Sequence, residues 1–222
     1  MAGTTRLKIY NGALLLAGER SIASLTEDRE PRRLLDTVWD KGGVRYCIEQ
    51  GQWQFAMRTQ QISQDPSIEP PFGYQYAFNK PTDWVATHAV CQDEFFNVPL
   101  TQYADEGDNW YAEIDPIYVK FVSDDADYGN DLAGWPQSFA EYVEAFLASK
   151  IVYKLNGNPK MVEFLFGKPG DPRGGELHRR LLIAKNKAAF TQPTRFPAES
   201  SWNSSRRGRS NLDRGNRGSL LG

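Results

Sequence analysis

Residues that commonly perform chemistry are few and scattered in this chain of 222 residues. His88 and His178 are the two histidines, and neither has a cysteine or a second histidine nearby at metal-ligand spacing. A metal ion needs several convergent ligands, so we predict that both are ordinary structural or surface residues. Cys47 and Cys91 could form one disulfide but no spaced framework, which favours a reducing place of synthesis. We expect no catalytic residue and no metal site.

An aspartate-rich stretch in the middle of the chain has part of the pattern of a calcium-binding loop. Asp125 and Asp127 are spaced correctly, but Gly129 stands at the third ligand position. Pro136 stands where such a loop requires a bidentate glutamate. The sequence therefore predicts a solvated loop at this place.

The signatures of phosphate binding and of acyl transfer are incomplete as well. Gly167-Lys168 precedes Pro169 instead of Ser or Thr, and the earlier glycine of a phosphate-binding loop is missing. No G-x-S-x-G motif occurs. We therefore expect no cofactor and no enzymatic activity. A glycosidase-type pair of carboxylates, acting on cell-wall glycans, remains an alternative because acidic residues are plentiful in the middle of the chain.

The charges are distributed unevenly although the net charge is only −2. Residues 60–135 carry 14 acidic and 2 basic side chains, whereas residues 193–222 carry 6 arginines and 2 acidic side chains. The segments 1–59 and 136–192 are mildly basic. Such asymmetry describes surfaces and partners rather than the fold. No apolar run approaches the length of a membrane span, and we expect no signal peptide and no membrane partner.

Helical periodicity places the first two elements of the chain. A helix is predicted from a cap at Thr4 or Thr5 to a stop at Gly18. A second helix is predicted over residues 31–50, with a kink or a close backbone approach at Gly42-Gly43.

A period of two residues follows Gly51 and predicts short strands. The expected strands are residues 53–62, 74–78, 84–90, 98–103, 109–114 and 117–122. The turn at 105–108 is typical of a hairpin. Short strands at close spacing indicate an antiparallel sandwich or a small barrel.

Helical periodicity returns after Pro136. A long helix should bury a stripe made of Phe139, Val143, Phe146, Leu147 and Ile151. A short helix near 159–166, a loop at 167–175 and a last helix should follow. The last helix should bury Leu177, Leu181, Ala184 and Ala188.

These elements together predict an α+β fold with a discontinuous helical part. Residues 1–52 and 136–191 should form a helical bundle, and residues 53–135 an inserted β domain. Residues 192–222 should form an extended basic C-terminal tail, because their composition buries too little apolar surface to fold alone.

Motifs in a characteristic order occur along residues 5–190. They are NGALLLAGERSIASL at 11–25, WQFA at 53–56, YQYAFNKPTDW at 74–84, DPIYVKFV at 115–122 and WPQSF at 135–139. Their order and spacing resemble those of tail tubular protein A-like proteins, the head-to-tail adaptors of short-tailed, podovirus-type bacteriophages. The glycine- and proline-rich loop at 167–175 and the arginine-rich tail depart from the family pattern.

The resemblance implies a structural virion protein that forms a ring, usually of twelve copies. The ring would join the portal protein to the tail nozzle protein at the head-tail junction, after assembly in the host cytoplasm. Double-stranded DNA would pass through its channel without being read in sequence.

The tail carries the partner-binding residues that we predict, for the portal or for a neighbouring subunit. The expected apolar anchors and arginines are Phe196, Trp202, Leu212, Leu220, Leu221, Arg206, Arg207, Arg209, Arg214 and Arg217. Two alternatives remain besides the glycan enzyme. One is a nucleic-acid-binding protein that uses the arginines of the tail, and the other is a soluble α+β domain without this role.

Overall fold

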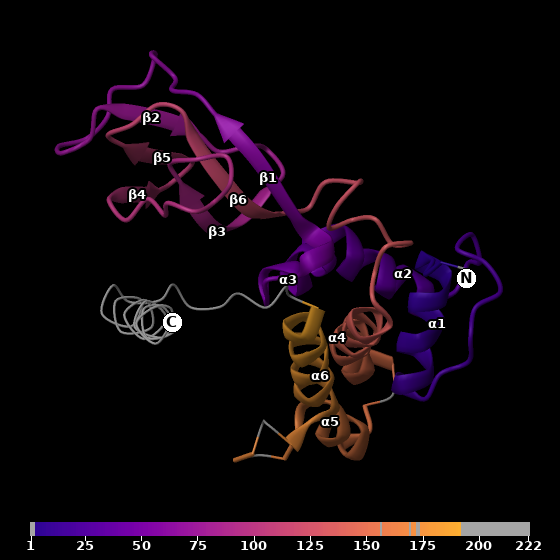
Figure 1. Ribbon diagram of the computed structural model, residues 1–222. Coiled ribbons are helices and arrows are strands. Elements are labelled where there is room, and N and C mark those ends of the chain that lie inside the picture. The colour runs from indigo at the N-terminus through magenta and orange to yellow at the C-terminus, as the bar shows by residue number, and fades with distance from the viewer. Residues whose placement is uncertain (1–2, 156, 169, 172–173, 192–222) are drawn as a thin grey trace, which may run out of the picture. The chain divides into compact units, whose positions relative to one another are not determined.

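The computed structural model describes residues 3–155, 157–168, 170–171 and 174–191, and it has an α+β fold (Figure 1). The helices are α1 Arg6–Ala17, α2 Glu30–Val38, α3 Val44–Glu49, α4 Gln137–Leu155, α5 Pro159–Phe166 and α6 Glu176–Thr191. The strands are β1 Met57–Ile62, β2 Tyr76–Asn79, β3 Trp84–Cys91, β4 Tyr103–Glu106, β5 Asn109–Ala112 and β6 Ile117–Ser123. The tail predicted at 192–222 lies outside the described residues.

Helix α1 begins and ends at the residues that the sequence indicates. The Thr5 hydroxyl accepts a hydrogen bond from the Lys8 backbone N–H at 3.4 Å. Gly18 ends the helix in the left-handed conformation, with φ of 76°. Gly12 lies against α4, where an added Cβ would come 2.2 Å from Cδ of Glu144.

The predicted second helix is interrupted at its two glycines. Between α2 and α3 the chain forms a π-helical turn, Trp39–Gly43, in which Gly42 has φ of 85°. Gly43 has no space for a side chain, because an added Cβ would lie 2.7 Å from the Val38 carbonyl oxygen. The predicted kink is therefore confirmed, whereas the close approach is by the preceding turn of the same segment and not by another backbone.

One buried cluster joins the helices from the two ends of the chain. It contains Ile9, Tyr10 and Leu14 of α1 together with the long stripe of α4. All the residues predicted for that stripe are buried: Phe139, Val143, Phe146, Leu147 and Ile151. Apolar packing between distant segments therefore holds α1 against α4.

The strands form two three-stranded antiparallel sheets, ordered β1-β6-β3 and β2-β5-β4. Side chains of both sheets share a second buried cluster, which includes Phe78, Trp110 and Phe121. The sheets do not close into a barrel, so that alternative is wrong for the described strands. Residues 1–191 nevertheless form one compact unit, because Val85 and Val122 at the near ends of β3 and β6 belong to the helical cluster.

Three predicted strands begin later than expected, since β1, β2 and β4 start at Met57, Tyr76 and Tyr103 instead of at 53, 74 and 98. A 3-10 turn at Gln54–Ala56 precedes β1, because the buried Trp53 indole N–H turns back to donate to the Ile48 carbonyl at 2.9 Å. The region predicted as a strand from 98 is largely loop, where the Asp93 carboxylate accepts the Val98 backbone N–H at 2.8 Å. Side chains that bond the backbone compete here with strand pairing.

Candidate functional site

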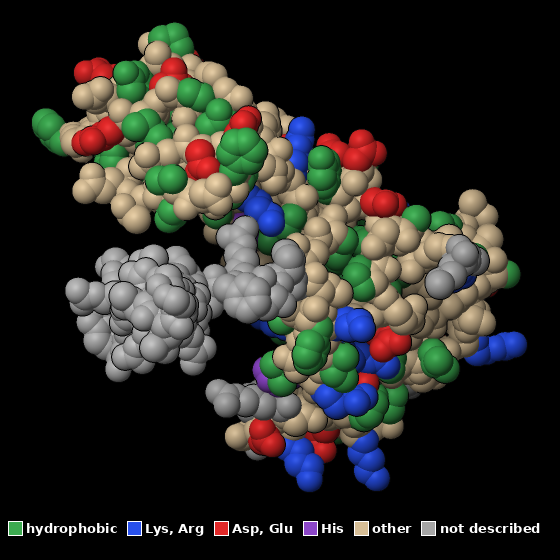
Figure 2. Space-filling view, viewed as in Figure 1, with side chains coloured by type: hydrophobic (Ala, Val, Ile, Leu, Met, Phe, Trp, Pro, Cys, Tyr) green, Lys and Arg blue, Asp and Glu red, His purple; other side chains and the backbone are tan. Residues whose placement is uncertain are grey.

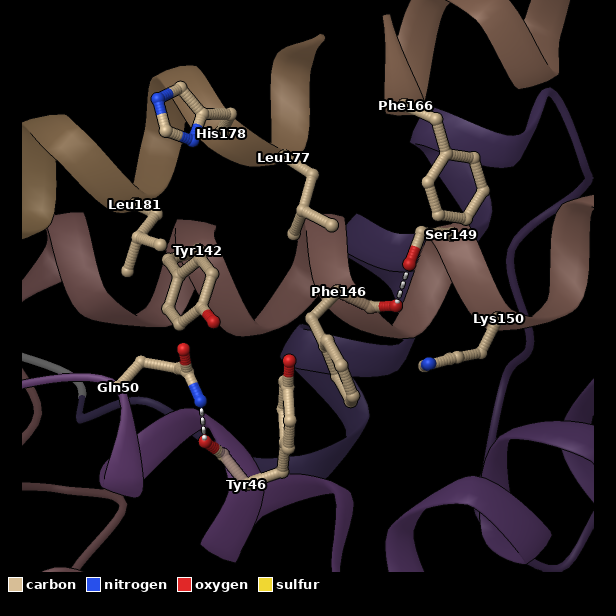
Figure 3. Close-up of a pocket in the computed structure, with 10 residues that line it drawn as sticks. All are labelled: Tyr46, Gln50, Tyr142, Phe146, Ser149, Lys150, Phe166, Leu177, His178 and Leu181. Atoms are coloured by element: carbon tan, nitrogen blue, oxygen red, sulfur yellow. Dashed lines mark hydrogen bonds between the residues drawn. The ribbon is translucent and has the colours of Figure 1, made fainter. Parts of the chain in front are cut away.

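A hollow of about 310 Å³ lies between α3, α4 and α6, beside the end of α5 (Figure 3). No described helix is both long and apolar enough to cross a membrane. The lining is mostly aromatic and aliphatic, with a few polar groups. It consists of Tyr46, Gln50, Tyr142, Phe146, Ser149, Lys150, Phe166, Leu177, His178 and Leu181.

The walls of the hollow are positioned by ordinary helix packing. The Tyr46 ring stacks on Phe146 with centroids 5.0 Å apart, and 48% of Tyr46 remains exposed. Ser149 uses its hydroxyl to donate to the Phe146 carbonyl at 2.7 Å, so it is not a free nucleophile. The Lys150 ammonium lies 5.1 Å from the Phe146 ring centroid. The hollow is therefore suited to an apolar side chain rather than to a reaction.

The groups behind the hollow are held in their neutral forms. Burial raises the pKa of the Cys47 thiol well above its ordinary value, and it also raises the pKa of the Tyr142 hydroxyl. A buried thiol with a raised pKa is a poor nucleophile near neutral pH. Cys47 and Cys91 are both buried and form no disulfide.

The candidate metal positions have local structural roles. Among the described residues, no group of three His, Cys, Asp or Glu side chains is arranged to hold a metal ion. The Asp125 carboxylate accepts the Asp127 backbone N–H at 3.0 Å, and the Asp125 carbonyl accepts the Asn130 N–H at 3.0 Å. The calcium-like stretch is thus a turn stabilised by its own side chain.

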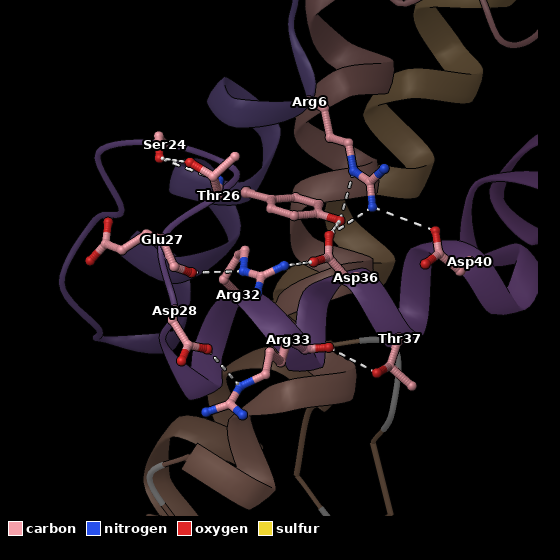
Figure 4. A network of polar contacts seen from close by, with 11 residues as sticks. Arg6, Ser24, Thr26, Glu27, Asp28, Arg32, Arg33, Asp36, Thr37 and Asp40 are labelled. Carbon is pink, nitrogen blue, oxygen red and sulfur yellow. Dashed lines mark hydrogen bonds and ion pairs between the residues drawn. The ribbon is translucent and has the colours of Figure 1, made fainter.

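A polar network connects α1 to α2 (Figure 4). Asp36 accepts hydrogen bonds from Arg6 at 2.7 Å, Tyr10 at 2.8 Å and Arg32 at 2.6 Å. The Arg6 guanidinium carbon also lies 4.9 Å from the Trp39 ring centroid. Because Asp36 is occupied by three donors, its carboxylate holds the two helices together.

A second polar cluster lies among the side chains of the β strands and their turns, around Lys80. The Lys80 ammonium pairs with Asp105 and lies 4.0 Å from the Trp84 ring centroid. Burial alone would raise the pKa of Asp105, but the hydrogen bonds from Lys80 and Thr87 lower it overall. Only 5% of the Lys80 side chain is exposed, so it is a structural cation and not a phosphate contact.

Exposed apolar side chains form the surface that sequence reasoning missed. The last helix was expected to bury one stripe; Ala184 is buried, whereas Leu177, Leu181 and Ala188 are only partly buried against the helical cluster. Leu182, Ile183 and Phe190 lie off that stripe and are exposed. The sequence did contain a signal for this surface. The outward-facing side of a helix is normally polar, and these apolar residues lie outside the spacing of the buried stripe.

The predicted site residues all lie outside the described residues, from Phe196 to Leu221, so their contacts stay predictions. His178 lines the hollow beside Leu177, but no second candidate ligand accompanies it there. No family model matches this chain, and no curated protein sequence matches it either.

Proposed function

We propose that this chain is a structural subunit of a ring that joins the portal to the tail nozzle of a short-tailed bacteriophage. Its role is mechanical, and double-stranded DNA passes through the ring without sequence reading. The ring contains about twelve copies, as in the family that the motifs resemble. The protein assembles in the host cytoplasm and resides in the virion at the head-tail junction.

The observation that carries this proposal is the sharing of one core by the two ends of the chain. Helices α1 and α4 pack together although the β strands lie between them in sequence. This packing supports a helical bundle of residues 1–52 and 136–191, with residues 53–135 as an inserted β-sandwich. A subunit of a ring needs such a firm body and an appended lobe for its neighbours.

The exposed apolar side chains support association rather than catalysis. They occur on α1, on α4 to α6 and on the loops between strands, and include Leu15, Phe72, Phe95, Tyr153, Phe164 and Phe190. Large exposed apolar patches commonly mark protein interfaces. The hollow beside α6 adds a concave place for a partner side chain.

Mixing the purified protein with portal rings of the same phage tests this function. Electron micrographs should show an added ring on the portal, and native mass spectrometry should give its stoichiometry. The isolated protein should be mainly monomeric or a small oligomer at micromolar concentration, measured by light scattering. A protein that never joins the portal is not an adaptor.

The tail can be tested in the same experiment. If it holds the portal through apolar anchors, Trp202→Ala should weaken portal binding by about 1 kcal/mol or more. If it contacts DNA instead, binding should fall with each arginine removed and with added salt. A chain ending at Gln192 that joins portal rings as well as the full chain would show that the tail is not the clamp.

A further inference from the structure

Three loops lie at one end of the β part, residues 53–135. Ile62 at the end of β1 and Cys91 at the end of β3 pair with neighbouring residues at the start of β6. The backbone N–H of Gln64 donates to Asp115 at 2.9 Å, which joins the first loop to the third. We call residues 63–75, 92–99 and 113–116 the loop end.

The loop end is acidic and aromatic. It contains no lysine or arginine, and its acidic residues are Asp65, Glu69, Asp93, Glu94, Glu113 and Asp115. Phe72 is fully exposed and Phe95 is 74% exposed. In Figure 2, red and green side chains are scattered among tan atoms on the visible face of the β strands. A surface of this kind fits a partner that is basic and apolar.

Such a partner surface occurs on the same chain. The outer face of α6, opposite its buried residues, carries Leu182, Ile183, Asn186, Ala189 and Phe190. Helical geometry places Lys185 and Lys187 along the two edges of this row, and both are exposed. Phe190 is 84% exposed. The outer face of α6 is thus apolar with basic edges, the complement of the loop end.

We propose that the loop end of one copy docks on the outer face of α6 of the next copy. The two surfaces differ, so the contact is head-to-tail, and a head-to-tail contact closes into a ring when the rotation between copies allows it. This inference rests on the proposed ring and names the faces that form it. The apolar side chains provide contact area, and the charges select the pairing.

Two charge-reversal variants test the pairing. The first carries Glu69→Lys and Glu94→Lys at the loop end, and the second carries Lys185→Glu and Lys187→Glu on α6. All four side chains are exposed, so the fold should be unaffected. Each variant alone should associate more weakly, because the first lowers the net charge of the loop end from −6 to −2 and the second makes the edges of α6 acidic. In an equimolar mixture, the unchanged loop end of the second variant meets the unchanged α6 of the first. Pairs with the wild-type contact therefore form between the two variants.

Sedimentation of the isolated protein at low salt and high concentration is the first measurement. We expect each variant to self-associate about tenfold more weakly than wild type, and the mixture to recover within about threefold. Added salt should weaken the association of wild type. Equal behaviour of wild type, both variants and the mixture would overturn the proposal.

Two control variants change the net charge by the same amounts as the test variants, but at other places on the surface. Glu106→Lys with Asp108→Lys reverses charge at the opposite end of the β strands, and Arg20→Glu with Lys41→Glu does so on the helical side. Both controls should associate like wild type. A loss as large as that of the test variants would mean that net charge, not these faces, governs association.

Assembly on portal rings separates this inference from the proposed function. Wild type should complete rings, whereas each variant alone should not. If all of them complete rings, the adaptor function stands and the assigned faces are wrong. If a chain ending at Thr191 loses association while charge reversal has no effect, the tail makes the contact and the proposal fails.

Discussion

The helical part and the β part of this protein place their polar groups differently. In the helical part, the carboxylate that joins α1 to α2, Asp36, lies near the surface, and the core behind it is apolar. In the β part, the Lys80 side chain is only 5% exposed, and its partly exposed partner Asp105 accepts a hydrogen bond from the fully buried Trp110. A second pair, Arg58 with Asp83 at 2.7 Å, joins β1 to the turn before β3 and buries its carboxylate. Each of these pairs places one charged side chain among the strands, where its partner must neutralise it.

Removing the β part is the most drastic test of this difference. If residues 60–131 are replaced by a short linker, a soluble product with helical circular dichroism should remain, because α1 and α4 pack directly. Its unfolding temperature should fall, since Val85 and Val122 leave the helical cluster. A complete loss of the helical signal would show that the two parts do not fold separately.

Removing an aromatic ring from the helical core should have the largest effect of any single substitution. Phe146→Ala should lower the free energy of unfolding by roughly 3–5 kcal/mol, measured by urea denaturation. Tyr153→Ala on the same helix is the matched control and should change it by less than about 0.5 kcal/mol, because Tyr153 is exposed. If Phe146→Ala leaves the free energy of unfolding close to that of wild type, the ring belongs to an interface instead of the core.

Breaking the ion pair between Lys80 and Asp105 in the β part should lower stability less than Phe146→Ala does. Asp105→Ala leaves the buried Lys80 without its carboxylate and should lower stability by about 2 kcal/mol, since Asp105 itself is partly exposed. Asp108→Ala, on the exposed turn of the same hairpin, should be nearly neutral. Near-ultraviolet circular dichroism of the tryptophans provides the measurement. Equal effects of the two substitutions would contradict the structural role of Lys80.

A pH dependence is expected within the helical part. Burial raises the pKa of Glu144 from 4.5 to about 7, against the attraction of Arg180, which is 3.7 Å away, and with repulsion from Glu141. The folded protein therefore holds this proton more tightly than the unfolded chain. The resulting stability is fully present below about pH 4.5 and is lost as the pH rises through 7.

Urea denaturation at pH 5 and pH 8 measures this loss. The free energy of unfolding should fall between the two values in wild type, and Glu144→Gln should remove most of the fall. Glu163→Gln, which changes an exposed carboxylate on α5, should leave it unchanged. An identical pH profile for wild type and Glu144→Gln would mean that Glu144 is ionised throughout.

Sequence reasoning identified the elements whose signals are local. The stop at Gly18 and the interruption at Gly42-Gly43 follow from backbone freedom, and the stripe of α4 follows from its period. The start of β1 was misplaced because the Trp53 indole bonds to a carbonyl of α3, which periodicity does not reveal. The hollow depends on how separate helices meet, which periodicity does not reveal. The apolar residues of the outer face of α6, by contrast, stand out in the sequence as departures from the buried period.

The contact of Gly12 with Glu144 has a consequence for related sequences. A glycine within a helix lowers helix stability by roughly 1 kcal/mol relative to alanine, yet here its missing side chain is the space that a glutamate of α4 fills. Positions 12 and 144 should therefore covary. A relative with alanine or serine at position 12 should carry a shorter residue at position 144, and a relative with glutamate at 144 should retain glycine at 12.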